Sequence, residues 1–107
     1  MKHISYFYYA ENESEINLEI WKEFMNNSEA ERKIHFDYTG IVFDIQLGAV
    51  GKVELPELVE TLLDENGMEA LSVLVVNEEV YKNGEFSVIE AVEELLDVGV
   101  SIQVEED

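Results

Sequence analysis

The chain begins with a stretch of aromatic and β-forming residues, after which apolar residues recur at helical spacing. Residues 3–9 place apolar or aromatic side chains on both faces of an extended segment, which predicts a central strand covered on both sides. A polar turn follows, and Asn12 or Ser14 can cap a helix that runs to about Asn27 with its apolar positions on one side. The chain is therefore expected to begin with a strand and a helix.

The region after this helix has a mixed pattern. Residues 26–28 mark a break, and the polar residues 29–33 either extend the helix or form a loop. Strict alternation then appears over residues 34–39 and again, after Gly40, over residues 41–47. This alternation predicts either one long strand with a glycine bulge or two short strands.

The next part of the chain has the signals of a helix followed by a hairpin. Pro56 stands where a first helical turn would begin, and Gly67 closes the apolar stripe that follows it. Residues 71–76 are a nearly continuous apolar run, which is typical of a buried strand. Asn77 and Glu78 form a plausible tight turn into a second, antiparallel strand.

A last helix completes the predicted fold. Ser87 and Glu90 form a capping box at its start. An acidic tail of about residues 99–107 follows, in which residues 101–104 could add an edge strand. We therefore predict one α/β domain over residues 1–107. A βαβ unit, then a β-hairpin and a helix, would form a mixed four-stranded sheet flanked by helices on both faces.

This order of elements resembles the thioredoxin-like superfamily. Residues 62–84, which read LLDENGMEALSVLVVNEEVYKNG, are similar to the second half of such a domain. The similarity is greatest to the arsenical-resistance metallochaperone branch. Residues 1–7 and 41–47 fit the first two strands of that family. The resemblance implies a thioredoxin-like fold.

The chain departs from that family where the family does its chemistry. The metalloid-binding or redox cysteines of the family follow the first strand, where this chain reads YAENES at residues 9–14, and the chain contains no cysteine. The family has a cis-proline before its hairpin strand, and Ser72 in that place predicts that this backbone feature is missing. The resemblance therefore implies a scaffold without thiol redox chemistry or soft-metal capture.

Composition adds a strong charge imbalance to this picture. The chain has 25 acidic and six basic residues, a formal net charge of −19. Residues 1–50 have a net charge of −5 and residues 51–107 a net charge of −14, so most of the excess lies in the second half. This charge disfavours direct binding to nucleic acid or to anionic lipid and favours a basic partner. Apolar residues make up 47% of the chain, which is enough for a folded core.

Two groups of carboxylates recur at helical spacing on the outward sides of the last two predicted helices. They are Glu57, Glu60, Asp64 and Glu65, and then Glu90, Glu93, Glu94 and Asp97. Neighbours at such spacings lie roughly 5–6 Å apart, which is comparable with the phosphates along one DNA strand. The rows could therefore imitate a nucleic-acid backbone to a basic groove. They could equally be solvated surfaces that keep the protein in solution.

Other chemistry has little support in the sequence. His3 and His35 have no patterned partner, and no nucleophile elbow, phosphate loop or hard-cation loop is present. We therefore expect no catalytic residue, no metal site and no cofactor. The first residues do not resemble a signal peptide and no segment is long enough to span a membrane, so a soluble, cytoplasmic protein is expected.

These observations leave two hypotheses for function. The first is a non-enzymatic protein that occupies the basic site of a nucleic-acid-binding protein, a device of phage and mobile-element inhibitors such as anti-restriction and anti-CRISPR proteins. The second is a degenerate thioredoxin-like regulator or chaperone that binds a protein partner by shape. Under the second hypothesis, Tyr8 and Tyr9 at the end of the first strand could form the contact.

Overall fold

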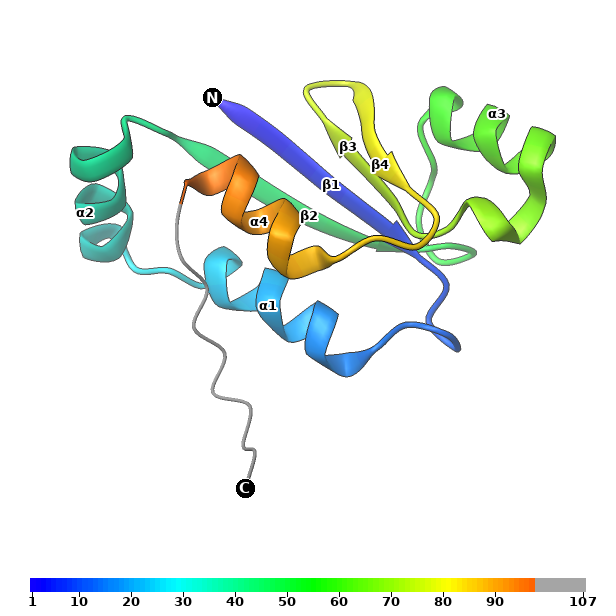
Figure 1. Ribbon diagram of the computed structural model, residues 1–107, viewed down its shortest axis with the longest axis horizontal. Coiled ribbons are helices and arrows are strands. Elements are labelled where there is room, and N and C mark those ends of the chain that lie inside the picture. Colours follow the sequence, from blue (N-terminus) through cyan, green and yellow to red (C-terminus); the bar gives the residue numbers. More distant parts are fainter. Residues whose placement is uncertain (98–107) are drawn as a thin grey trace.

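Four strands and four α-helices build the part of the chain that the structure, a computed structural model, describes, residues 1–97 (Figure 1). In chain order the elements are β1 (Lys2–Tyr8), α1 (Glu15–Met25), α2 (Glu29–Thr39), β2 (Phe43–Ala49), α3 (Glu57–Asn66), the short 3-10 helix η1 (Gly67–Ala70), β3 (Val73–Val76), β4 (Glu79–Asn83) and α4 (Val88–Leu96).

The four strands form one mixed sheet in the order β2-β1-β3-β4. Strand β1 is parallel to β2 and antiparallel to β3, and β3 is antiparallel to β4. At the centre, Ile4 lies opposite Ile45 on one side and Val76 on the other. The predicted fold class, a mixed four-stranded sheet built from a βαβ unit and a hairpin with a final helix, is confirmed.

The sheet has an apolar core on each face because successive side chains of a strand point to opposite sides. On one face, Ile4 and Tyr6 of β1 pack with Trp21 of α1 and with the buried side of α4. On the other face, Phe7 of β1 packs with Val59 of α3 and with the buried residues of β3 that point that way. Helices α1 and α4 therefore cover one face of the sheet and α3 covers the opposite face.

Several local signals in the sequence mark element ends correctly. The Ser14 side chain caps α1 by accepting a hydrogen bond from the Ile16 N–H. Gly67, with a φ of 72°, follows the last residue of α3. The Asn77–Glu78 turn has two positive φ values, 50° and 69°, as a type I′ hairpin turn requires. The hairpin turn, the start of α1 after Ser14 and the end of α3 before Gly67 are thus confirmed.

The prediction of a strand over residues 34–39 is wrong, because these residues belong to helix α2. Ser28 and Glu31 form a complete capping box at its start, and Gly40 ends it with a left-handed φ of 73°. The alternation of Ile34, Phe36 and Tyr38 does not reflect a buried strand face, since all three side chains are exposed. Only the second alternating segment is a strand, β2.

Ser72, just before β3, also differs from expectation. The peptide bond between Leu71 and Ser72 is cis, so the prediction that this backbone feature is missing is wrong. The acidic tail of about residues 99–107, and the edge strand predicted at residues 101–104, lie outside the described residues.

Candidate functional site

Helix α4 carries one of the two predicted acidic rows and packs firmly against the rest of the protein. Its inward side is buried against the sheet through Val88, Ala91, Val92, Leu95 and Leu96. The Ser87 hydroxyl caps the helix by accepting from the Glu90 N–H, which is half of the predicted capping box. With its apolar side fixed inward, the helix directs its acids outward: Glu90, Glu94 and Asp97 are exposed and Glu93 is half-buried.

Contacts with strand β4 hold part of this row in place. Glu94 accepts a 2.8 Å hydrogen bond from the Tyr81 hydroxyl and lies 3.9 Å from the Lys82 ammonium group. The hydrogen bond to Glu94, with a smaller contribution from burial, raises the pKa of Tyr81 above its usual value. Because both side chains of this ion pair are at least a third exposed, the pair contributes little to stability.

Helix α3 carries the second predicted row, on the other side of the molecule. Glu57, Glu60, Asp64 and Glu65 are all exposed. Because α3 packs on the face of the sheet opposite to α4, the two rows point away from each other. The eight predicted residues therefore form two separate surfaces, and no single flat groove could contact both.

Helix α1 supplies acids that the sequence analysis did not select. Glu15, Glu19 and Glu23 are exposed and stand four residues apart, opposite the buried Ile20 and Trp21. Since α1 lies beside α4 on the same face of the sheet, these acids face the same solvent as the α4 row. Their i, i+4 spacing was a signal available in the sequence. We call the exposed sides of α1 and α4 the α1–α4 acidic surface.

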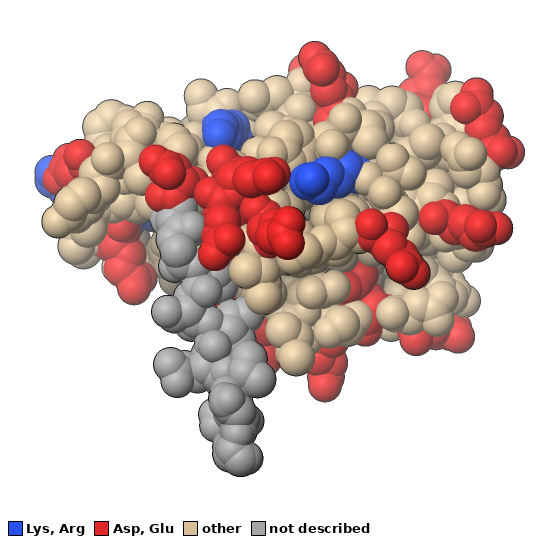
Figure 2. All heavy atoms as spheres, in the orientation of Figure 1, with Lys and Arg blue, Asp and Glu red and all other residues tan. Residues whose placement is uncertain are grey.

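The charge distribution on this surface is uneven. In the view of Figure 2, which has the orientation of Figure 1, acidic side chains are spread over the visible face and gather over α4. Few basic atoms lie between them. Carboxylates at this density repel one another and attract a basic partner over a Debye length, about 8 Å at physiological ionic strength.

A second polar cluster lies at the end of β1, where the sequence predicted no chemistry. The Glu13 carboxylate accepts hydrogen bonds from the Tyr6 hydroxyl at 3.0 Å, the Ser72 hydroxyl at 2.8 Å and the Asn17 amide at 2.8 Å. The Ser14 backbone N–H is a fourth donor, at 3.2 Å. This cluster ties together β1, the start of α1 and the segment before β3.

The Glu13 cluster holds its tyrosine in the neutral form. Burial, together with the nearby Glu13 charge, raises the pKa of Tyr6 far above its usual value of 10.0. A small cavity of about 100 Å³ adjoins the cluster and is lined by Tyr9, Asn12, Met68 and Leu71 as well as Glu13 and Ser72. Because every Glu13 oxygen already accepts hydrogen bonds from the protein, the geometry favours a structural tie over a reactive carboxylate.

The two tyrosines proposed as a contact patch lie in different environments. Tyr8 is half-buried against the core and its ring lies 6.0 Å from that of Tyr6. Tyr9 is half-buried at the small cavity, and its hydroxyl donates to Glu11 at 3.1 Å. Tyr9, not Tyr8, is therefore the better placed of the two for contact with a partner.

Other classes of site are sparse in the described residues. Over residues 1–97, no group of three or more His, Asp or Glu side chains converges closely enough to hold a metal ion. The two histidines have different partners. His3 pairs with Asp44 on the sheet at 2.6 Å, and the His35 ring lies 2.7 Å from the Leu96 carbonyl oxygen. No helix among these residues has both the length and the apolar character to cross a bilayer.

Comparisons with known proteins leave the family undecided. Neither protein-family models nor curated proteins contain a match to this chain. The resemblance to thioredoxin-like proteins and to arsenical-resistance metallochaperones therefore stays a prediction from the sequence pattern.

Proposed function

We propose that this protein is a non-enzymatic interaction protein whose α1–α4 acidic surface occupies the basic site of a nucleic-acid-binding protein. The observation that carries the proposal is the outward row of carboxylates on α4, a helix that buries five of its nine residues and so presents its acids on a rigid support. A fixed row of this kind could replace a phosphate backbone without ordering a flexible segment on binding. The mechanism is competitive occlusion, steered by long-range attraction.

The positions of the helices support α4 together with α1 as the surface that such a partner would contact. The α4 row, Glu90, Glu93, Glu94 and Asp97, shares its face with the acids of α1, whereas the α3 row faces the opposite direction. One basic groove would therefore engage α4 together with α1. The α3 row would stay in solvent and contribute to solubility.

Charge-neutralising variants test this proposal against the general effect of net charge. A triple variant E90Q/E93Q/E94Q removes three charges from α4 and keeps a hydrogen-bond acceptor at each position. The matched control E57Q/E60Q/D64N removes three charges from α3. Both proteins have the same net charge, so any difference in binding comes from the position of the charges.

The readout is capture of partners on the tagged protein from host lysate, with stepwise salt elution and competition by duplex DNA or RNA. We expect a nucleic-acid-binding protein that elutes at moderate salt, is displaced by nucleic acid, and binds the α4 variant at least tenfold more weakly than the α3 variant. Equal binding of both variants, or a partner that ignores salt and nucleic acid, would exclude the decoy mechanism.

A second candidate function is a regulator that recognises its partner by shape. The observation in its favour is the cavity at the end of β1, where Tyr9 and the half-exposed Met68 adjoin the Glu13 cluster. This end of the sheet is where the resemblance to thioredoxin-like proteins would place a contact. If Tyr9→Ala and Met68→Ala abolish capture while the α4 variant keeps it, the regulator hypothesis replaces the decoy hypothesis.

A further inference from the structure

Helix α2 and the start of β2 form a face unlike the rest of the molecule. Helix α2 buries none of its eleven residues, although it is well capped at both ends. Large apolar side chains are left in solvent on it and just after it: Ile34 is 57% exposed, Phe36 47%, Tyr38 86% and Val42 45%. A monomer rarely leaves this much apolar surface together without a use for it.

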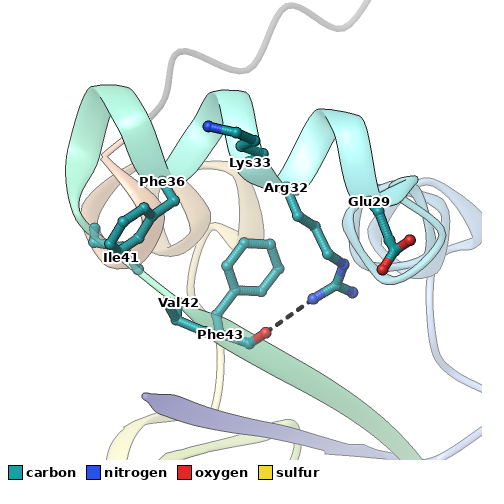
Figure 3. A pocket seen from close by; sticks show the side chains of 7 residues that line it. All are labelled: Glu29, Arg32, Lys33, Phe36, Ile41, Val42 and Phe43. Atoms are coloured by element: carbon teal, nitrogen blue, oxygen red, sulfur yellow. Dashed lines mark hydrogen bonds between the residues drawn. The ribbon is translucent and has the colours of Figure 1, made fainter.

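A groove runs along one flank of this helix. It has a volume of about 360 Å³ and lies between α2 and the chain that leads into β2 (Figure 3). Its apolar lining comes from Phe36, Ile41, Val42 and Phe43, and Glu29, Arg32 and Lys33 contribute its charged rim. Figure 3 shows Arg32 extending beneath the helix to the Phe43 carbonyl oxygen, a hydrogen bond of 3.1 Å.

Charge sets this face apart from the remainder of the chain. Residues 29–43 contain three acids, Glu29, Glu31 and Asp37, and two bases, Arg32 and Lys33, and so have a net charge of −1. All other residues together contain 22 acids and four bases, which accounts for −18 of the net charge of −19. The α2 face, by which we mean α2 with residues 40–43, is therefore a nearly neutral apolar region on a strongly acidic protein.

We propose that the α2 face binds a second copy of this chain and forms a two-fold symmetric dimer. Two molecules of charge −19 repel each other wherever acidic surfaces meet, so self-association is least opposed where local charges nearly balance. Ile34 and Tyr38 stand one helical turn apart and form an exposed apolar strip on the side of α2 away from the groove. In a two-fold interface, this strip of each protomer can pack against the same strip of its partner.

The charged residues of the face fit the same arrangement. Asp37, next to Tyr38, pairs with Lys33 at 3.2 Å within the helix, and both side chains are more than half exposed. Both side chains flank the strip of Ile34 and Tyr38, so in an antiparallel pair of helices each Lys33 can approach the partner's Asp37, and carboxylates meet cations across the interface. A basic partner, in contrast, would bring its charge toward Arg32 and Lys33 and be disfavoured.

The size of the face sets the expected strength of the dimer. An eleven-residue helix is only about 16 Å long, and a stable standard-sized interface buries about 800 Å² on each partner. A single pair of such helices is smaller than this, so we expect micromolar dissociation and clear dependence on concentration.

Sedimentation velocity of the full chain from low micromolar to about 1 mM protein tests the proposal. We expect the weight-average mass to rise toward twice the chain mass. Tyr38→Glu should weaken the dimer at least tenfold, because it puts a charge into the apolar contact between the two helices. The matched control is Ile16→Glu on α1, where Ile16 is similarly apolar and 58% exposed, and it should leave the dimer intact.

The dimer proposal does not depend on the proposed function, and the response to salt distinguishes the two. Raising salt from about 0.05 to 0.3 M should strengthen the dimer because it screens repulsion between two acidic molecules, and it should weaken capture of a basic partner. The dimer proposal fails if the chain stays monomeric throughout the concentration range, which would leave the face to residues 98–107 or to another protein. It also fails if Ile16→Glu weakens the dimer as much as Tyr38→Glu does.

A spin-label experiment covers the case in which Tyr38→Glu misfolds. The chain has no cysteine, so Ala30→Cys on exposed α2 and Glu90→Cys on α4 each provide a single labelling site. A dimer through α2 gives a shorter distance between copies for the α2 label than for the α4 label. The reverse order would place the interface elsewhere and overturn the proposal.

Discussion

Helices α2 and α4 begin and end alike and yet have opposite relations to the rest of the protein. Each starts at a serine cap, Ser28 or Ser87, and each ends at a residue in the left-handed conformation, Gly40 or Asp97. Helix α4 buries five of its nine residues, whereas α2 buries none of its eleven. Local signals therefore formed both helices, but only packing against the sheet anchored one of them.

The difference explains how each helix meets solvent. Because the apolar side of α4 packs into the core, its exposed side consists mainly of carboxylates, and they form a rigid acidic row. Within residues 1–97 the apolar residues of α2 enter no core, since the contacts of this helix there are a few side-chain hydrogen bonds such as Arg32 to Phe43 and His35 to Leu96. The same protein thus has an acidic surface and a nearly neutral apolar surface, suited to different partners.

The difference in anchoring between α2 and α4 can be tested most directly by truncating one apolar side chain on each helix. Leu96→Ala on α4 removes a fully buried side chain and should lower the free energy of unfolding by about 2–5 kcal/mol. Ile34→Ala on α2 removes an exposed one and should change it by less than about 0.5 kcal/mol. Urea denaturation at low protein concentration measures both. Similar losses for the two variants would contradict the difference in anchoring.

Alkaline pH should weaken the core beneath α4 through Tyr6. The folded pKa of Tyr6 is raised above its unfolded value of 10.0, so the folded state keeps a proton that the unfolded state loses. The stability linked to this proton is complete below about pH 10 and falls as pH rises further. Tyr6→Phe should cost on the order of 1 kcal/mol at neutral pH because Glu13 loses a donor.

The test compares denaturation of both proteins at pH 8 and pH 11. Tyr6→Phe should lose less stability between these pH values than the wild-type protein. If both proteins lose the same amount, Tyr6 is not the titrating group. Tyr81, whose pKa is also raised, is largely exposed and should contribute little.

Removal of the two serine caps tests whether α2 unfolds separately from the core that contains α4. Ser87→Ala should lower global stability by about 1 kcal/mol because α4 is part of the cooperative core. Ser28→Ala removes an equivalent cap, but α2 can open without the core, so its effect should appear in amide hydrogen exchange of α2 and hardly in global unfolding. Equal global effects would show that α2 unfolds together with the sheet.

Salt should have the smallest effect on the fold itself. Added NaCl screens repulsion among the carboxylates, so the melting temperature should rise by a few degrees. The E90Q/E93Q/E94Q variant should show a smaller rise than the wild-type protein, because three of the repelling charges on α4 are gone. A flat or falling response in the wild-type protein would mean that the carboxylates are locally compensated.

Much of the fold was predictable because its signals are local. The Ser87 cap, the glycine after α3 and the hairpin turn at Asn77 act within a few residues and were identified correctly, and Ser14 was one of two caps predicted for α1. The error at residues 34–39 arose because alternation was given more weight than the caps at Ser28 and Gly40. A period of two predicts a strand only when one set of residues is buried, and exposure cannot be read from alternation alone.

The candidate site was predictable only in part. The outward position of the eight selected acids follows from helical spacing, and seven of them are exposed with Glu93 half-buried. The separation of the α3 row from the α4 row depends on which sheet face each helix covers, which no local pattern contains. The Glu13 cluster was also invisible in the sequence, because Ser72 lies 59 positions from Glu13.

The sequence alone determined the fold class, most element ends, the lack of thiol chemistry and a net charge of −19, since these depend on composition and on neighbours in the chain. Tertiary structure decided which acids share a surface, which apolar residues are buried and which surface has little net charge. The physical reason is that burial and electrostatic attraction depend on distances in space, and the topology of the sheet sets those distances. Helix α2 shows this most clearly: its ends are determined by nearby residues, and its exposure by the absence of a core to pack against.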